Sequence, residues 1–372
     1  MEKTFAALIL AVWVGLVAVN IVVPNQDFSV LENRFLSKLP TFSLETLVSG
    51  EYMQKMDEYI NDHFIARDVW VSVKTTSEYL IGKRESNGVF IGKGALQPSL
   101  TDPDEKAVNR NIEGIQSFVK QYGLPSSLMI IPSSSEIQKD KHPPYAQVFD
   151  QKAFINEVYA RLSGVVSPID AYGALAREAG EYIYYKTDHH WTTDGAYAAY
   201  ASACEALGIP VRPYEEFAVQ QVSDSFYGTL YSKSGFRFVS PDTIKAVSLN
   251  QTKKYSVTTA TAPKEYDSIY FKEFLDKKDK YSYFLGTNEA LVTIETNAGT
   301  GKSLLVFKDS YAHSFVPFLM GDYDRITLVD MRYLNAGLGI VKVEDYDQAL
   351  FLYSVDVFSH QSDIGKLRTN SK

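Results

Sequence analysis

Residues 303–313 read SLLVFKDSYAH, an apolar run of strand length that leads through Lys308 and Asp309 to a serine. Four consecutive apolar residues predict a strand that is buried on both faces, as in a parallel sheet covered by helices. Ser310 would then follow the carboxyl end of that strand and stand at the start of a helix over residues 311–319. Open α/β sheets bind ligands at this edge. The segment therefore predicts an α/β fold with Ser310 at its functional edge.

The other apolar segments follow the order expected for such a sheet. Runs of strand length alternate with runs whose apolar residues recur every three or four positions. The predicted strands cover residues 89–92, 127–132, 165–170, 182–185, 304–307, 325–330 and 348–354. The predicted helices cover residues 44–74, 104–122, 152–162, 172–179, 196–207 and 311–319. A helix followed by a wholly apolar strand indicates a parallel central sheet with helices on both faces.

The composition changes within the chain. Residues 211–300 are rich in Ser, Thr, Tyr, Phe and Lys and contain short alternating runs without a long helical pattern. This pattern predicts a β-rich insertion in the sheet domain. We therefore expect three parts: an N-terminal anchor over residues 1–24, a helical juxtamembrane segment over 25–85, and an α/β domain over 86–372.

The N-terminal stretch FAALILAVWVGLVAVNIVV, residues 5–23, is nineteen residues long and carries no charge. An apolar helix of this length spans a bilayer. Lys3 precedes it, and the tendency of basic residues to stay inside places the short end in the cytoplasm. We expect an uncleaved, single-pass signal-anchor in the cell membrane, with the rest of the chain outside the cytoplasm. Secretion with cleavage near residues 18–20 is the alternative.

The overall composition narrows the classes of function. The chain has 372 residues, of which 45% are hydrophobic and 22% charged, as in a globular protein with a sizeable core. Its net charge of −8 argues against nucleic acid as a partner, because nucleic-acid-binding faces are basic. Cys204 is the single cysteine, so no disulfide can form within the chain. It stands among small residues and is expected to pack as a small apolar group; a Cys–His nucleophile is the alternative.

A second polar segment, TDHHWT at residues 187–192, supplies an acid and a base. A serine hydroxyl becomes a good nucleophile when a base removes its proton, and a third group must orient that base. Asp188 and His190 are two residues apart, so on an extended segment their side chains point to the same side, while His189 points away. We therefore expect Asp188 to hold His190, and His190 to act as the base for Ser310.

Other interpretations of the same residues remain open. An Asp-Ser pair before a helix is often a helix cap, and a histidine beside a tryptophan is often part of a core. Asp188, His189 and His190 also include the side chains that bind metals. Adjacent histidines rarely bind one ion, however, and helical metal sites use spacings of three or four residues. We therefore expect no metal.

The run Asp188-His189-His190-Trp191 resembles the signature of the DHHW family, which is similar to the SGNH-hydrolase-like proteins that O-acetylate alginate and other exported polysaccharides. The resemblance covers most of the chain. Its further segments are Glu32-Asn33-Arg34, Asp62-His63-Phe64-Ile65-Ala66-Arg67, the Pro132 loop, Phe226-Tyr227-Gly228-Thr229-Leu230-Tyr231 and Lys308-Asp309-Ser310-Tyr311-Ala312.

The resemblance implies an SGNH-like three-layer α/β/α sandwich in a rearranged order, with Asp-x-His before the serine. It makes Ser310 the nucleophile, His190 the base and Asp188 its orienting partner. Lys308 stands where the ordinary SGNH pattern has a glycine before the Asp-Ser pair. The residues proposed to form the oxyanion hole or to line the site are Gly286, Asn288, Tyr311 and Arg332.

The activity that the resemblance implies is a serine O-acetyltransferase, or acetylesterase, that acts outside the cytoplasm on an exported polysaccharide or a cell-wall glycan. It implies no cofactor. A membrane-bound O-acyltransferase that passes acyl groups across the bilayer would be the partner. Two alternatives stay open: an inactive scaffold that binds glycan or the acyltransferase through a tyrosine-rich surface, and a metal-dependent phosphoesterase.

Overall fold

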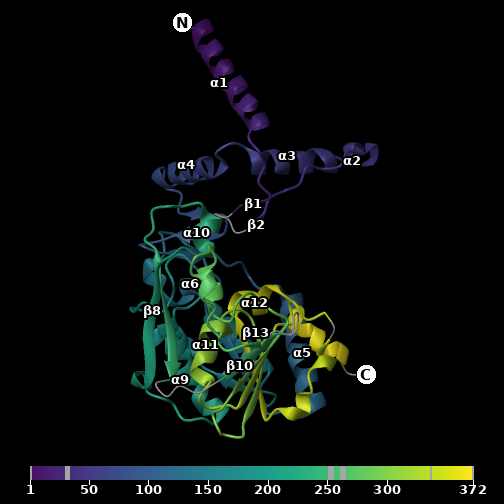
Figure 1. Ribbon diagram of the computed structural model, residues 1–372, viewed down its shortest axis with the longest axis vertical. Coiled ribbons are helices and arrows are strands. Elements are labelled where there is room, and N and C mark those ends of the chain that lie inside the picture. The colour runs from purple at the N-terminus through teal and green to yellow at the C-terminus, as the bar shows by residue number, and fades with distance from the viewer. Residues whose placement is uncertain (1, 30–33, 250–254, 260–264, 336, 371–372) are drawn as a thin grey trace.

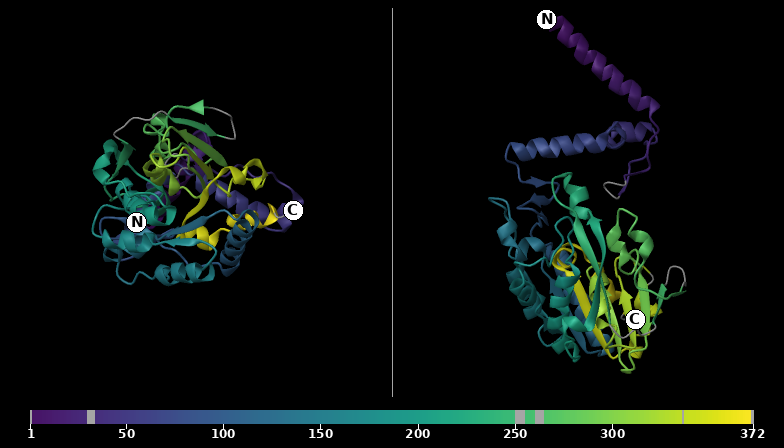
Figure 2. Two further views of the ribbon diagram at one scale, coloured as in Figure 1. Left: turned by 90° about the horizontal axis from the view of Figure 1, so that it is seen from below. Right: turned by 60° about the vertical axis from the view of Figure 1, so that its left-hand side comes forward.

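An eight-stranded sheet forms the centre of the protein, and helices lie on both of its faces (Figure 1, Figure 2). The structure is a computed structural model that describes residues 2–29, 34–249, 255–259, 265–335 and 337–370. In spatial order the strands are β11 (Glu265–Tyr266), β10 (Tyr255–Thr259), β12 (Leu291–Thr296), β14 (Arg325–Val329), β13 (Ser303–Lys308), β15 (Gln348–Ser354), β6 (Ser126–Ile131) and β7 (Ser167–Ile169).

The sheet is mixed. The five strands from β14 to β7 pair in parallel, whereas β12, β10 and β11 continue the sheet with antiparallel pairing. The expectation of a parallel central sheet therefore holds for its main part only. The antiparallel strands come from the region that was expected to be a β-rich insertion in the sheet domain, and part of residues 211–300 completes the central sheet itself. Pairing between distant strands decides this, and local composition does not reveal it.

Alternate residues of the central strands enter two different cores. In β13, Leu304 and Val306 face one side of the sheet and Leu305 and Phe307 the other, and all four are fully buried. One face is covered by α8 (Ala171–Arg177), α9 (Thr193–Leu207) and α11 (Ala312–Leu319). The other is covered by α5 (Glu105–Tyr122), α7 (Gln151–Arg161), α12 (Val355–His360) and η7 (Asp363–Asn370). The result is three layers, because each strand has an apolar face on both sides.

The direction of the crossovers indicates the edge at which open α/β sheets bind ligands. The connection from β6 to β7 carries α7 on one face of the sheet, and the connection from β13 to β14 carries α11 on the other. Connections that leave toward opposite faces open a crevice at the carboxyl ends of the strands between them. That crevice lies beyond β13, β15 and β6, and Ser310 follows β13 directly.

Smaller elements surround the sheet. The short strands are β1 (Phe28–Ser29), β2 (Arg34–Phe35), β3 (Glu85–Ser86), β4 (Val89–Ile91) and β5 (Leu96–Pro98), and β8 (Phe217–Phe226) pairs with β9 (Asp242–Leu249). The short helices are α6 (Ser134–Ile137), α10 (Thr229–Ser234), η1 (Lys139–Lys141), η2 (Tyr214–Glu216), η3 (Lys272–Phe274), η4 (Lys280–Tyr283), η5 (Leu338–Ile340) and η6 (Val343–Asp345).

The N-terminal helices lie beyond one end of the central sheet (Figure 1). They are α1 (Glu2–Val22), α2 (Leu44–Val48), α3 (Glu51–His63) and α4 (Arg67–Leu80). The single helix expected over residues 44–74 is broken twice, at Gly50 and at Ala66, both of which have positive φ angles. Within the part of the chain that the structure describes, no helix is both long enough and apolar enough to cross a membrane.

The strand predicted over residues 182–185 was wrong. The chain there turns back on itself, and the segment forms one isolated antiparallel bridge, Tyr184 with Trp191. The Tyr185 N–H donates to the His190 carbonyl, and the Thr192 N–H donates to the Ile183 carbonyl. Asp188 and His190 therefore sit on a folded loop, and they do not follow a strand of the central sheet as predicted.

Candidate active site

Asp188, His190 and Ser310 form one hydrogen-bonded row. The His190 Nε2 atom lies 2.7 Å from Ser310 Oγ, and its Nδ1 atom lies 2.6 Å from Asp188 Oδ1. A carboxylate only accepts hydrogen bonds, so Nδ1 carries the proton and Nε2 accepts the Ser310 hydroxyl. Asp188 and His190 are buried, with exposures of 1% and 4%, whereas Ser310 is partly exposed. The structure thus brings together the three residues that the sequence predicts, 120 positions apart for His190 and Ser310.

The second oxygen of Asp188 is held by the start of α10. Thr229 donates to Asp188 Oδ2 through its backbone N–H at 2.7 Å and its hydroxyl at 3.0 Å. Burial acts to raise the pKa of Asp188, but the neighbouring His189 and His190 and these hydrogen bonds outweigh it, so the pKa lies well below its usual range. Asp188 is therefore ionised when His190 takes up a proton.

Gly228 is necessary for this contact. A Cβ atom at position 228 would lie 2.2 Å from both Cβ and Oδ2 of Asp188, far inside van der Waals distance. Its φ of −86° is available to any residue, so the close approach of the backbone, and not its conformation, requires glycine. Gly228 and Thr229 were expected only as part of a motif segment, and the sequence did not indicate that they contact Asp188.

Asp242, at the start of β9, holds the loop that carries Asp188. Its Oδ1 atom accepts from the Tyr182 hydroxyl at 2.5 Å and the Lys186 N–H at 2.8 Å. Its Oδ2 atom accepts from the Thr187 N–H at 2.8 Å and the Thr187 hydroxyl at 2.5 Å. Asp242 is fully buried and accepts four hydrogen bonds. These bonds hold the loop, which forms no regular strand of its own.

Asp309 fixes the other side of the site. Its Oδ2 atom accepts from the N–H and the hydroxyl of Ser354, each at 2.7 Å, and its Oδ1 atom accepts from the Tyr311 N–H at 3.0 Å. Burial raises the pKa of Asp309, and these hydrogen bonds oppose that effect. Asp309 thereby ties the end of β13 to the end of β15 and sets the turn that presents Ser310.

The backbone around Ser310 leaves one amide for a developing oxyanion. The Tyr311 N–H is used by Asp309, the Ala312 N–H donates to the Asp309 carbonyl, and the His313 N–H donates to the Ser310 carbonyl. No hydrogen bond from the Ser310 N–H is found within the part of the chain that the structure describes. Of the amides next to the serine, the Ser310 N–H is therefore the one that remains to donate to an oxyanion.

Comparison with known families follows this geometry. Residues 119–329, more than half of the chain, match the family described as DHHW protein. The chain belongs to the DHHW protein family. No curated protein sequence matches this DHHW protein.

Solved structures share the fold. A DHHW family protein from Eubacterium siraeum is 24% identical, with a TM-score of 0.65 over 75% of this chain and 97% of that one. Bacillus cereus PatB1, solved alone and with a sulfonyl adduct, is 17% identical, with TM-scores of 0.60 over 73–74% of this chain and 95–98% of that one. The O-acetyltransferase domain of Pseudomonas putida AlgJ is more distant, with 14% identity and a TM-score of 0.47 over 76% and 99%. The first two share a mixed α/β fold with this DHHW protein.

Of the remaining predicted site residues, Tyr311 lies beside the row, whereas Gly286, Asn288 and Arg332 have no hydrogen bond to it among the described residues. The Tyr311 ring lies beside the row, with its centroid 5.0 Å from that of His190, and its hydroxyl donates to the His189 carbonyl. Gly286 lies in a turn with a φ of 75°, against the ring of Phe271. The expected place of Gly286, Asn288 and Arg332 in an oxyanion hole therefore stays a prediction.

Asn288 and Arg332 belong to a buried ionic cluster next to the row. Lys308, 1% exposed, donates to His313 Nε2 at 2.8 Å, to Asp330 Oδ2 at 3.2 Å and to Asn288 Oδ1 at 3.5 Å. Arg332 binds both oxygens of Asp330. Burial lowers the pKa of Lys308, and the Asp330 carboxylate opposes this effect. The lysine that departs from the ordinary pattern is thus an internal cation with a partner.

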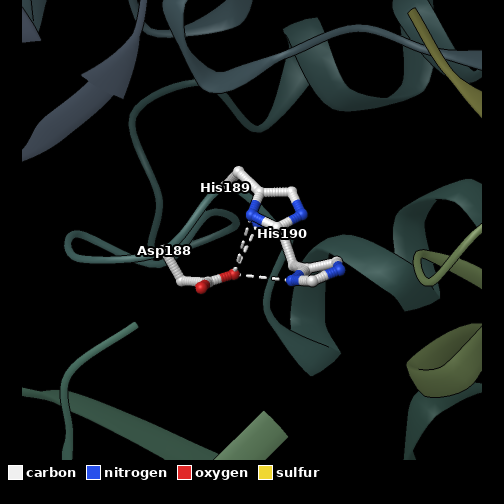
Figure 3. Close-up of side chains that lie close together, drawn as sticks. All are labelled: Asp188, His189 and His190. Atoms are coloured by element: carbon white, nitrogen blue, oxygen red, sulfur yellow. Dashed lines mark hydrogen bonds and ion pairs between the residues drawn. The ribbon is translucent and has the colours of Figure 1, made fainter. Parts of the chain in front are cut away.

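The described residues contain one group that could hold a metal ion, Asp188 with His189 and His190, whose ligand atoms all lie within 4.8 Å of one another (Figure 3). Their atoms already have partners. His190 uses both ring nitrogens in the row, and His189 Nδ1 lies 2.7 Å from the Thr229 hydroxyl. An ion here would have to replace these hydrogen bonds. The contacts of Asp188, His189 and His190 therefore fit hydrogen bonding better than metal binding.

Two further features bear on the alternatives. Cys204 is fully buried in α9, its Sγ lies 3.2 Å from the Tyr200 carbonyl, and burial raises its pKa to about 11, so it is no nucleophile. Beside Asp188 lies a cavity of about 480 Å³. Its lining includes Gly228, Thr229, Lys233, Lys278 and, from α4, Arg67. A ligand in this cavity would lie against the carboxylate side of the row.

Proposed function

We propose that this DHHW protein is a serine O-acetyltransferase of the SGNH-like class that acts on a polysaccharide outside the cytoplasm. The observation that carries the proposal is the continuous row from Asp188 through His190 to Ser310 at the carboxyl edge of the parallel strands. An ionised acid, a histidine with one nitrogen free to accept, and a partly exposed serine are the parts needed to activate a hydroxyl.

In the first half-reaction, His190 Nε2 takes the proton of Ser310 as Oγ attacks the carbonyl carbon of an acetyl donor. The negative charge that develops on the carbonyl oxygen is stabilised by the Ser310 N–H. When the tetrahedral intermediate collapses, the bond to the leaving group breaks and the leaving group receives the proton from His190. The product is an acetyl ester on Ser310.

In the second half-reaction, His190 takes the proton of an acceptor hydroxyl, which attacks the acetyl-serine carbonyl. The bond to Ser310 Oγ breaks, and Oγ recovers its proton from His190. A sugar hydroxyl as the acceptor gives O-acetylated polysaccharide, and water gives acetate. The same residues thus support transfer and ester cleavage, and access of water to the acyl-serine decides between them.

We also propose that residues 5–23 anchor the protein in the cell membrane by a single span, with residues 25–85 as a juxtamembrane segment and 86–372 outside the cytoplasm. The support is the charge-free length of that stretch together with the preceding Lys3. A membrane-bound O-acyltransferase would be a suitable partner, because an acetyl donor must reach the outer side of the bilayer.

The proposal is tested with the full-length chain and 4-nitrophenyl acetate. Ser310→Ala and His190→Ala should each lower turnover at least about a thousandfold, and Asp188→Ala about a hundredfold or more, because the three act as one unit. Ser303→Ala, at the other end of β13, is the matched control and should keep full turnover. Equal background rates in all variants would favour the inactive scaffold.

A covalent probe and metal analysis give independent readouts. PatB1 has been solved with a sulfonyl adduct, so a sulfonyl fluoride is a suitable reagent for this DHHW protein. Mass spectrometry should find one adduct on Ser310, which is absent from Ser310→Ala and much slower to form in His190→Ala. A stoichiometric transition metal in the purified protein, lost together with activity on chelation, would instead favour the metal-dependent phosphoesterase.

A further inference from the structure

Exposed apolar side chains are concentrated at one end of the molecule. Within the described residues, the large exposed hydrophobic side chains lie mostly between residues 5 and 81. Those beyond this part are scattered singly: Tyr145, Val211, Val219, Phe238, Tyr333 and Ile340. Single exposed apolar residues are ordinary on soluble surfaces, whereas a contiguous group marks an interaction site.

The domain holds α4 in one orientation. The Thr75 hydroxyl, which is buried, donates to the Ser234 carbonyl at 3.2 Å. The Tyr79 ring packs on Phe236, with centroids 4.8 Å apart, and Val71 lies against Gly235, where an added Cβ would come within 2.7 Å of Val71 Cγ1. One face of α4 is thus already occupied, and the helix cannot turn its other face inward.

The other face of α4 is also apolar. Val69, Trp70, Val73, Leu80 and Ile81 are between 49% and 86% exposed. At about 100° per residue they fall within a sector of about 120° on the helix. The indole N–H of Trp70 donates to the Ile65 carbonyl, so its polar atom already has a partner within the chain. This sector has no covering element among the described residues.

The neighbouring helices α2 and α3 also carry exposed apolar side chains. Leu44 and Val48 in α2 and Met53 and Ile60 in α3 are exposed as well. In Figure 1 the helices α2, α3 and α4 lie in a row between α1 and the sheet domain, and Figure 2 shows α1 leaving from the side of the row that faces away from the domain. Most of the large apolar side chains of α1, from Phe5 to Val22, are also exposed.

We propose that α2, α3 and α4 lie flat on the membrane surface, with the apolar sector of α4 at the boundary between headgroups and acyl chains. The inference rests on the membrane location proposed above. A bilayer that holds α1 meets these helices before it meets the rest of the protein, which is why a bilayer is the occupant rather than another protein. Interfacial helices combine an apolar sector with a tryptophan and flanking lysines. Here these are Trp70, with Lys74 in α4 and Lys83 just beyond it; the two lysine side chains are 72% and 49% exposed, and both pair with Glu78.

The arrangement has a consequence for the site. Arg67, the first residue of α4, lines the same cavity as Asp188, so a helix on the membrane also forms one wall beside the hydrogen-bonded row. A flat-lying α4 would therefore hold the carboxyl edge of the sheet toward the bilayer, at a fixed distance from it.

The test uses the full-length chain in phosphatidylcholine–phosphatidylglycerol vesicles, in a Cys204→Ala background, with one nitroxide label per protein. Labels go on Val73→Cys and Leu80→Cys, with Tyr145→Cys, fully exposed on the domain, as the aqueous control. Val14→Cys in α1 reports insertion of the anchor. Collision rates with oxygen, which partitions into lipid, and with a water-soluble nickel chelate give the depth of each label. Positions 73 and 80 should show an oxygen-to-nickel ratio at least about threefold above that of position 145 and below that of position 14.

Each other outcome overturns the inference in a distinct way. A ratio at positions 73 and 80 equal to that at position 145, with position 14 in lipid, means that the anchor inserts and α4 stays in water. Dipolar broadening between labels at position 73 means that a second copy covers the sector. A label at position 14 that is exposed to water would contradict both the proposed membrane anchor and the inference about α4. Turnover of 4-nitrophenyl acetate is measured on the same samples, so a failed membrane contact is separable from a failed serine site.

Discussion

The ring of Tyr281 lies flat against the imidazole of His190, with centroids 3.8 Å apart and planes 9° apart. The Tyr281 hydroxyl donates to the Ser310 carbonyl at 3.1 Å and lies 3.1 Å from Ser314 Oγ. One side chain therefore contacts both the expected base and the segment that presents the serine. Tyr281 belongs to no motif in the sequence, and only the folded chain shows that it contacts both segments.

Replacing Tyr281 separates its ring from its hydroxyl. Tyr281→Leu should lower kcat about tenfold with little change in KM, because a stacked aromatic pair contributes roughly 1 kcal/mol to holding His190. Tyr281→Phe keeps the ring and should retain most of kcat. Steady-state kinetics with 4-nitrophenyl acetate checks both variants. Equal losses in Phe and Leu would assign the effect to the hydroxyl and contradict the role of the stack.

Gly228→Ala should lower turnover about a hundredfold while leaving most of the fold intact. The new methyl group would displace the Asp188 carboxylate, and a shift of about 1 Å in such a group costs roughly a hundredfold in rate. The matched control is Gly180→Ala, where a Cβ meets nothing within 4 Å. Turnover and thermal unfolding of both variants make the comparison. Full turnover in Gly228→Ala would show that the position of Asp188 is unimportant.

Asp242→Asn should destabilise the protein and lower activity together. The amide leaves two of the four buried donors from Tyr182, Lys186 and Thr187 without an acceptor, which costs about 2–4 kcal/mol in the free energy of unfolding. Denaturant unfolding measures this loss, with Asp224→Asn on the exposed side of β8 as the control. A stable variant without activity would mean that Asp242 acts on the chemistry and not on the loop.

Lys278 should contribute stability that grows as the pH rises from about 8 to about 10.5. Burial lowers the pKa of Lys278 to about 8, whereas in the unfolded chain it keeps a value near 10.5. Between these values the unfolded state binds the proton more strongly, so raising the pH favours the folded state. Lys278→Met should flatten this rise in denaturant midpoints measured from pH 8 to 10.5, and the exposed neighbour in Lys277→Met should not. An unchanged slope in Lys278→Met would assign the rise to other groups.

Much of the sheet domain was predictable because its signals are local. The helix over Glu105–Tyr122, the strand Ser126–Ile131 and the strand Gln348–Ser354 agree with the sequence within about one residue. Each has a periodicity or an unbroken apolar run that only one type of structure can bury. The three-layer order followed from the same runs, since a strand that is apolar on both faces needs a cover on both.

The failures have a common cause. The segment 182–185 carries residues typical of a strand, but its backbone pairs with residues 190–192 in a turn and not with the sheet. The loop that follows is held at Lys186 and Thr187 by Asp242, which is more than fifty positions away. The antiparallel strands at the sheet edge, β10 to β12, depend on pairing with β14. In residues 44–74 the helical periodicity was present, yet the breaks at Gly50 and Ala66 depend on backbone angles that periodicity does not show. Part of one resembling segment, Glu32 and Asn33, lies outside the described residues.

The sequence by itself determined which residues meet in the row. The two-residue spacing of Asp188 and His190 and the position of Ser310 after an apolar strand are local signals, and family resemblance pointed to the same three residues. Only the tertiary structure decided what surrounds them: Thr229 on Asp188, Tyr281 on His190, and Lys308 paired with Asp330. The reason is physical. Secondary structure depends on neighbours along the chain, whereas the contacts of a side chain depend on which distant segment packs against it, and those contacts carry no period in the sequence.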